Sequence, residues 1–177
     1  MYFLSTRGDE RVTGAQAIVQ GLAKDGGLFV PETFPQVTKE EFDKMLTMSY
    51  PERAAFVLHK YLDDYDYDGL LEATQKAYGK FDGPDPAPLV RIDDDKYILE
   101  LFHGPTCAFK DMALTVLPYL LRKGCDICGI KEQILILVAT SGDTGKAALE
   151  GFKDADGIKI MVFYPDEGVS KMQKLQM

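Results

Sequence analysis

Long apolar runs are missing from this sequence of 177 residues, and basic residues are fewer than acidic ones. No run reaches the roughly 18 apolar residues of a transmembrane helix, and the charged opening MYFLSTRGDE does not fit a signal peptide. The net charge of -8 argues against nucleic acid as a partner, because nucleic-acid binders normally carry a basic stripe. We therefore expect neither a membrane nor a nucleic-acid partner.

Cysteine is also scarce, with three residues in the whole chain. A small odd number without a signal peptide indicates reduced thiols and a cytoplasmic location. Two of the three form a CxxC, Cys125 to Cys128, which alone is half of a zinc site. We expect no metal site, and a redox role is the alternative to a chance pair in a solvated loop.

The first part of the chain shows start signals of short helices. Residues 13–16, 38–41 and 49–52 have the spacing of capping boxes, and a further helix is expected from about residue 70 to 78. The segment FDGPDPAP, residues 81–88, then reads as a linker or domain edge. We therefore predict a helical N-terminal region over 1–83 and an α/β domain over 84–177.

The second part of the chain alternates between strand and helix patterns. A nearly continuous apolar run is typical of a strand that is buried on both faces of a parallel sheet. The strand-helix-strand order predicts parallel pairing with a right-handed crossover. The expected strands are 96–102, 133–139 and 158–164, and the expected helices are 110–123, kinked by Pro118, and 144–152.

The last residues open one more helix with a capping box, Ser170 to Gln173, and the sequence ends four residues later. A natural domain rarely ends inside a helix. We therefore expect the sequence to be the front part of a longer protein, with an incomplete α/β domain whose partner is the missing C-terminal half of the same chain.

The loop Thr140-Ser-Gly-Asp-Thr-Gly145 follows a predicted buried strand and opens a helix. Ligands of open α/β sheets bind at this end of the strands, and free N–H groups at a helix start favour an anion. The spacing matches neither a P-loop nor GxGxxG, so a carboxylate suits the loop as well as a phosphate. The alternative is a plain turn in which Asp143 or Thr144 caps the helix.

Lys110, within HGPTCAFKD, lies at or near the start of a predicted helix. The helix dipole and burial among Phe102, Phe109 and Leu114 would favour a neutral amine, which Schiff-base chemistry needs. The alternative is a solvated lysine that pairs with Asp111. An amine and a carboxylate cradle together suggest pyridoxal phosphate acting on an amino acid.

Five stretches, in order, resemble motifs of the threonine synthase family: STRG from residue 5, DGGLFVPE from 25, ELFHGPTCAFKD from 100, ATSGDTGKAA from 139 and YPDEGVSKMQKLQM from 164. The resemblance implies a type II pyridoxal-phosphate fold. It also implies a lyase that converts O-phospho-L-homoserine and water to L-threonine and phosphate.

The resemblance further implies roles for individual residues. Lys110 would hold the cofactor covalently and transfer protons. The substrate carboxylate would be bound by Ser141, Gly142, Asp143 and Thr144. Asp143 would also lie near the cofactor, although related type II enzymes have asparagine there, which leaves its partner open.

Further expectations concern single positions. His103 is a second candidate base whose alternative role is to support the loop, and Arg7 is a candidate for the substrate phosphate only because it is cationic. Cys107 replaces an expected leucine and packs as a small hydrophobe. The family's glycine-rich loop for the cofactor phosphate is not found, so we expect the 177-residue chain alone to bind the cofactor weakly and to lack turnover.

Two alternatives stay open. One is another type II lyase, such as threonine dehydratase or cysteine synthase, against which Asp143 argues. The other is a catalytically silent relative of threonine synthase that binds a phosphorylated metabolite.

Overall fold

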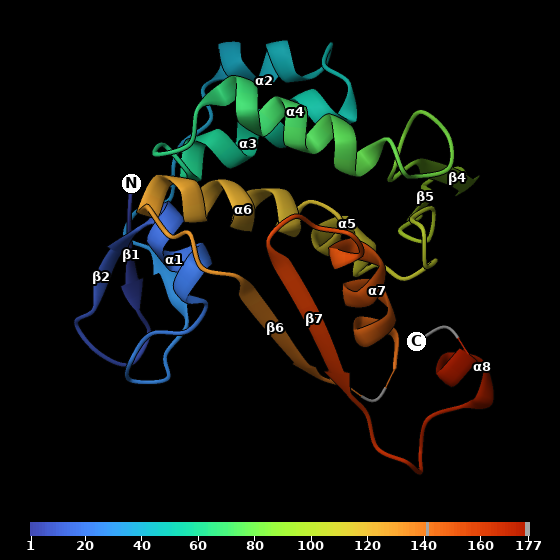
Figure 1. Cartoon of the computed structure of the whole chain (residues 1–177). Helices are drawn as coiled ribbons and strands as arrows, with labels where there is room; N and C mark the ends of the chain where they lie inside the picture. Colours follow the sequence, from blue (N-terminus) through green and yellow to red (C-terminus); the bar gives the residue numbers. More distant parts are fainter. Residues whose placement is uncertain (141, 176–177) are drawn as a thin grey trace. The chain divides into compact units, whose positions relative to one another are not determined.

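The computed structural model describes residues 1–140 and 142–175, which divide between two compact units (Figure 1). Unit 1 comprises Met1–Gln75 and Tyr119–Lys131, and unit 2 comprises Lys76–Pro118 and the residues from Glu132 onward. The mixture of helices and strands confirms the predicted α/β class. No helix in the described ranges is long and apolar enough to cross a membrane. The division at residue 83 stays a prediction.

Unit 1 contains a small antiparallel sheet and a group of helices. The sheet has the order β2-β1-β3, with Phe3 opposite Val12 and Leu4 opposite Val30. Its elements are β1 (Tyr2–Ser5), β2 (Arg11–Thr13), α1 (Gly14–Gln20), β3 (Phe29–Pro31), α2 (Lys39–Met45), α3 (Tyr50–Tyr61), and most of α4 (Tyr67–Tyr78) and α6 (Leu117–Cys128).

The predicted helix starts of unit 1 are confirmed. Thr13, Thr38 and Ser49 are the N-cap residues of α1, α2 and α3, and the side chain three positions later accepts a hydrogen bond from each cap N–H. The expectation of helices alone was wrong, however, because it missed the sheet. Its strands have only 3 or 4 residues, too few to show the alternation that identifies a strand in a sequence.

Unit 2 contains two separate pairs of strands. β4 and β5 form an antiparallel hairpin. β6 and β7 are connected by α7 and pair in parallel, as the strand-helix-strand pattern predicted. The elements are β4 (Leu89–Asp93), β5 (Lys96–Leu99), α5 (Asp111–Leu114), β6 (Ile134–Ala139), α7 (Asp143–Phe152), β7 (Ile158–Phe163) and α8 (Lys171–Leu175).

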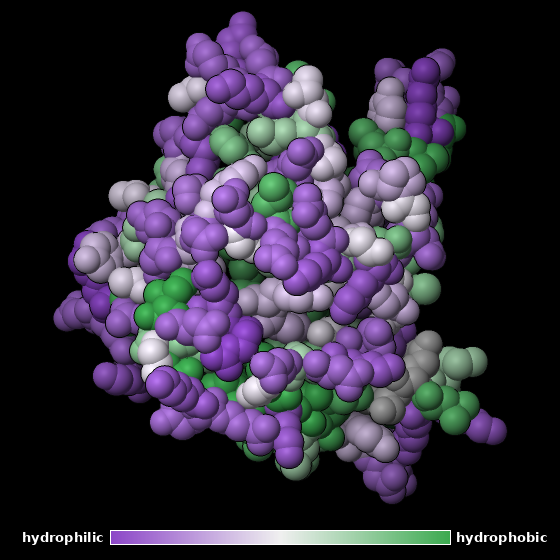
Figure 2. All heavy atoms as spheres, turned by 45° about the horizontal axis from the view of Figure 1, so that its top comes forward, coloured by the Kyte–Doolittle hydropathy of each residue, from purple (hydrophilic) through white to green (hydrophobic). Residues whose placement is uncertain are grey.

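Only one face of the parallel pair is covered, so the prediction of strands buried on both faces was wrong. Exposure alternates along β6 and β7, and α7 packs against the strands. Leu135, Leu137, Met161 and Phe163 on the other face are 48% to 63% exposed. Apolar side chains are visible at the surface in the space-filling view (Figure 2). The run is apolar because both faces of the strands carry apolar side chains, but no element among the described residues covers one of these faces.

The helix predicted over 110–123 is divided into α5 and α6 ahead of Pro118. Proline has no N–H to bond the carbonyl four residues earlier, which belongs to Leu114. Helix α7 lies directly against this carbonyl, since a Cβ built at Gly151 would be 2.2 Å from the Leu114 oxygen. Gly151 is buried at this contact, and because it has no Cβ it permits the close approach of α5 and α7.

We predict that Gly151→Ala destabilises the protein by about 1–3 kcal/mol, because the new methyl group would overlap a backbone oxygen. The matched control is Gly69→Ala in α4, where the added Cβ meets only the flexible Asp66 carboxylate. Thermal unfolding followed by circular dichroism measures both variants. Equal unfolding temperatures for Gly151→Ala and the unchanged protein would contradict the close approach.

Candidate functional site

Lys110 lies where the loop from Gly104 meets α5. It is the N-cap residue of that helix, which confirms the prediction that it begins a helix. A turn precedes it, in which the Cys107 N–H donates to the Gly104 carbonyl oxygen at 3.0 Å. Cys107 has a φ of 56°, in the left-handed region that side chains rarely adopt. Cys107 is exposed, so the expectation that it packs as a small hydrophobe was wrong.

The Lys110 side chain is half-buried, and its Nζ atom lies 4.8 Å from the centre of the Phe109 ring. The expected burial against aromatic rings was wrong, because Phe102 and Phe109 are 52% and 60% exposed. Both rings belong to irregular segments rather than to a packed helix face. The amine is therefore within reach of a ligand.

Asp111 is hydrogen-bonded to Thr106 rather than paired with Lys110. Its carboxylate accepts hydrogen bonds from the backbone N–H of Thr106 at 2.8 Å and from the Thr106 hydroxyl at 2.7 Å. The residue is 1% exposed. Within the described ranges Lys110 has no carboxylate partner. The interpretation of Lys110 as one half of a surface ion pair with Asp111 was therefore wrong.

The predicted anion loop connects β6 to α7. Thr140 closes it, since its hydroxyl oxygen accepts hydrogen bonds from the N–H groups of Gly142 and Gly145, each at 3.2 Å. Gly145 is required here, because a Cβ would lie 2.2 Å from the Thr140 methyl carbon. Gly142 is the N-cap residue of α7, so the alternative of a cap at Asp143 or Thr144 was wrong. Ser141 lies outside the described residues.

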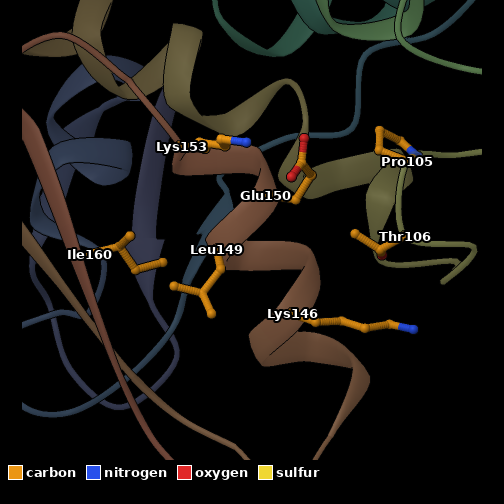
Figure 3. A pocket seen from close by; sticks show the side chains of 7 residues that line it. All are labelled: Pro105, Thr106, Lys146, Leu149, Glu150, Lys153 and Ile160. Atoms are coloured by element: carbon orange, nitrogen blue, oxygen red, sulfur yellow. The ribbon is translucent and has the colours of Figure 1, made fainter. Parts of the chain in front are cut away.

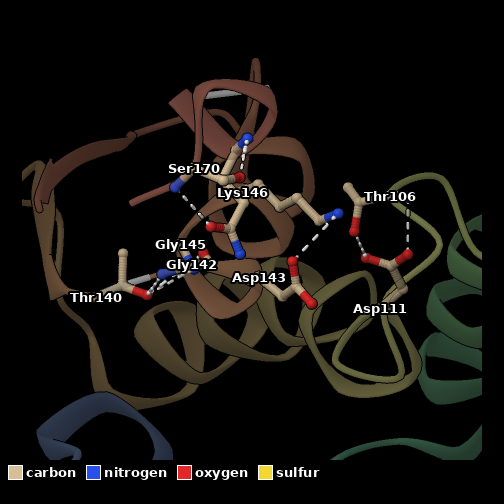
Figure 4. A network of polar contacts seen from close by, with 9 residues as sticks. Thr106, Asp111, Thr140, Gly142, Asp143, Gly145, Lys146 and Ser170 are labelled. Atoms are coloured by element: carbon tan, nitrogen blue, oxygen red, sulfur yellow. Dashed lines mark hydrogen bonds and ion pairs between the residues drawn. The ribbon is translucent and has the colours of Figure 1, made fainter. Parts of the chain in front are cut away.

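A lysine compensates the acidic side chain in this loop. The Asp143 Oδ1 atom is 3.4 Å from the Nζ atom of Lys146, one helical turn later (Figure 4). Asp143 is 60% exposed at its side chain, whereas Lys146 is only 11% exposed. Lys146 was not among the site residues predicted from the sequence. The spacing of three residues on a helix was the signal that could have identified the pair.

A second residue missed in the sequence lies over the same loop. A Cβ built at Gly142 would be 2.7 Å from the Nε2 atom of Gln173. The predicted capping box of α8 fixes this side chain, because Gln173 Oε1 accepts from the Ser170 N–H at 3.1 Å and Ser170 Oγ accepts from the Gln173 N–H at 3.2 Å. The amide group of Gln173 thus faces the start of α7.

A cavity of about 480 Å³ lies beside these groups in unit 2 (Figure 3). Pro105 and Thr106 line it from one side and belong to the loop from Gly104 to Lys110, the lysine loop. Lys146 and Glu150 of α7 line it from the other side. The lysine loop and the anion loop thus lie in the same unit, and the cavity is lined by residues of the lysine loop and of the helix that follows the anion loop.

The remaining candidates are His103 in unit 2 and Arg7 in unit 1. The Nε2 atom of His103 lies 2.7 Å from Glu100 Oε2, and its ring stacks on Phe102 with the centres 4.6 Å apart. Arg7 is exposed in unit 1, where its backbone N–H donates to Ser5 Oγ at 3.1 Å. The supporting role of His103 and the phosphate-binding role of Arg7 stay predictions.

The CxxC lies in the last turns of α6, in unit 1, rather than in a solvated loop. Both of its thiols are free, and no group of three or more metal-binding side chains is found in the part of the chain that the structure describes. Burial raises the pKa of both Cys125 and Cys128 above the usual value for a thiol.

Comparisons with known proteins identify relatives of the whole chain. Residues 2–78 match the family model described as threonine synthase N terminus. Threonine synthase of Pseudomonas aeruginosa is 40% identical over 100% of this chain and 38% of that protein, and threonine synthase-like 1 of Mus musculus is 39% identical over 92% of this chain and 22% of that protein. The crystal structure of PLP-bound threonine synthase from Brucella melitensis matches with a TM-score of 0.92 and 38% identity, covering 100% of this chain and 38% of that chain.

We predict that Thr140→Val exposes the N–H group of Gly142, because valine cannot accept a hydrogen bond, whereas the Gly145 N–H keeps the Gly142 carbonyl oxygen as an acceptor at 3.0 Å. The Gly142 amide hydrogen should exchange with solvent on the order of tenfold faster, as expected for the loss of one hydrogen bond. Thr140→Ser keeps the hydroxyl and is the control. Unchanged exchange in Thr140→Val would refute the role of the hydroxyl in closing the loop.

We also predict a pH-dependent order of thiol alkylation. Cys107 is exposed and should react first with iodoacetamide, whereas Cys125 is buried and should react last. Because the pKa values of Cys125 and Cys128 are raised, fewer thiolates are present at a given pH, and their rates should keep rising above pH about 8.5, the usual pKa of a free thiol. Mass spectrometry of digests at several pH values measures this, and early modification of Cys125 would contradict it.

Proposed function

Since this chain corresponds to the N-terminal portion of threonine synthases, we propose that the protein converts O-phospho-L-homoserine and water to L-threonine and phosphate. The observation that carries the proposal is the likeness to a PLP-bound threonine synthase over 100% of this chain. The chain spans 38% of the length of that relative, so the activity is proposed for the protein as a whole.

Lys110 is proposed to hold pyridoxal phosphate through a covalent bond to its amine. The fit is chemical: the side chain is a primary amine, half-buried, and without a carboxylate partner among the described residues. Bound pyridoxal phosphate supplies an aldehyde carbon for this amine and a ring that accepts electrons. Lys110 Nζ would then take and return protons at the α and β carbons of the substrate.

The start of α7 is proposed to bind the substrate carboxylate. The first N–H groups of a helix and its dipole favour an anion, and α7 has 10 residues to support that dipole. Asp143 and Thr144 open this first turn, Gly142 is its N-cap residue with its N–H donated to the Thr140 hydroxyl, and Ser141 is assigned by the resemblance alone. The Asp143 carboxylate would repel the substrate, and its pairing with Lys146 offsets that charge. Contact between Asp143 and the cofactor also remains part of the proposal.

A second candidate is a relative of threonine synthase that binds a phosphorylated metabolite without turnover. Identity does not decide between the two candidates, since the chain is 39% identical to a protein named threonine synthase-like 1 of Mus musculus and 40% identical to the Pseudomonas aeruginosa threonine synthase. The two candidates share a fold and differ in whether Lys110 forms a covalent bond and supports turnover.

We predict that borohydride reduction of the natural full-length protein, incubated with pyridoxal phosphate, leaves a pyridoxyl group on Lys110. Peptide mapping by mass spectrometry locates the group. Lys110→Ala should lose this adduct, and release of phosphate from O-phospho-L-homoserine should fall by at least a thousandfold, because no other group replaces the amine.

Lys80→Ala is the matched control, since Lys80 is an exposed lysine of the same unit. It should keep both the adduct and the activity. An adduct on another lysine, or most of the activity surviving in Lys110→Ala, would overturn the assigned role. A protein that binds the substrate but forms no adduct would support the second candidate.

A further inference from the structure

Asp111 is a buried carboxylate directly beside Lys110, and the proposed chemistry does not use it. It is 1% exposed, and burying a charged group is costly unless hydrogen bonds compensate it. Both of its oxygens are used, since Oδ2 accepts from the Thr106 N–H at 2.8 Å and Oδ1 accepts from the Thr106 hydroxyl at 2.7 Å. These bonds fasten the loop before Lys110 to the helix after it (Figure 4).

The same carboxylate packs against the beginning of the loop. A Cβ built at Gly104 would lie 2.4 Å from Asp111 Cβ and 2.5 Å from Asp111 Oδ2. The Gly104 carbonyl oxygen also accepts the hydrogen bond from Cys107 that closes the turn. The segment from Gly104 to Asp111 is therefore a closed loop. Its two end residues are in contact, and Asp111 is hydrogen-bonded to Thr106 within it.

Helix α5, which carries Asp111, is held by its own C-cap residue and by neighbouring elements. The Thr115 hydroxyl donates to the Asp111 carbonyl oxygen at 2.7 Å, and the Tyr78 hydroxyl donates to the Met112 carbonyl oxygen at 3.0 Å. The Leu114 carbonyl lies against Gly151 of α7. Since Lys110 directly precedes this helix, its Cα position depends on the closed loop on one side and on α5 on the other.

We propose that Asp111 is a positioning residue for Lys110: through its two hydrogen bonds to Thr106 it fixes the backbone from which the lysine amine reaches its ligand. This inference rests on the proposed function. It differs from an ion-pair role, because the carboxylate acts on the loop and not on the amine. Small misplacements of a reacting group cost on the order of a hundredfold in rate, so the loop closure should be visible in kcat.

The test compares variants of the natural full-length protein that change these hydrogen bonds one at a time. Thr106→Val removes the hydroxyl bond and should lower kcat about tenfold, while KM changes less than twofold. Thr106→Ser keeps the hydroxyl and should restore kcat. Asp111→Ala removes both bonds and should lower kcat by on the order of a hundredfold.

Asp111→Asn separates positioning from charge. Its amide oxygen can accept from the Thr106 N–H and its amide nitrogen can donate to the hydroxyl oxygen, so the loop stays tied without the negative charge. This variant should keep kcat within about threefold of the unchanged protein if the hydrogen bonds are what matters. A loss as large as that of Asp111→Ala would overturn positioning in favour of a role for the charge.

Thr74→Val is the control for stability, because Thr74 is also a buried threonine whose hydroxyl donates hydrogen bonds, in unit 1. It should lower the unfolding temperature without lowering kcat. If Asp111→Ala does not fold, Thr106→Val and Thr106→Ser decide the matter alone, and equal kcat values in these two variants would overturn the inference.

The pyridoxyl adduct on Lys110 distinguishes failure of this inference from failure of the proposed function. An adduct with normal kcat in Thr106→Val and Asp111→Ala rejects the role of Asp111 only. No adduct in the unchanged protein rejects the proposed function and this inference together.

Discussion

The close approach of α7 to the carbonyl of Leu114 is the constraint on which the arrangement of unit 2 depends. Pro118 cannot donate to that carbonyl, and Gly151 offers no Cβ that would keep α7 away from it. The helix that follows Lys110 is therefore packed against the helix that carries the anion loop. A proline and a glycine, neither of which carries a reactive group, thus bring two chemically distinct loops into one packed block.

Charge in the anion loop is balanced locally. The Asp143 carboxylate lies at the start of α7 with its Oδ1 atom 3.4 Å from Lys146 Nζ, and the Thr140 hydroxyl accepts hydrogen bonds from the N–H groups of Gly142 and Gly145. The loop is therefore shaped by its own side chains before any ligand enters. Preorganised groups of this kind do not have to reorganise during a reaction, which is the usual source of their effectiveness.

Local sequence signals predicted the strand-helix-strand unit, the helix starts and the placement of Lys110, because each depends on a few consecutive residues. Contacts between distant segments were not predictable. The short strands around Phe3 pair with partners that periodicity does not reveal, and the contact between Gln173 and Gly142 joins residues 31 positions apart. The exposure of Phe109 was misjudged because apolar composition does not tell whether another segment covers a side chain.

The open face of the parallel strand pair has a consequence for the behaviour of the chain in solution. Leu135, Leu137, Met161 and Phe163 form an apolar surface on two strands whose outer edges pair with no other described strand. Unpaired edges and an uncovered apolar face are the two features through which sheets associate with one another. These two features favour association of this face with another apolar surface, and a cover over it would serve colloidal stability as much as folding.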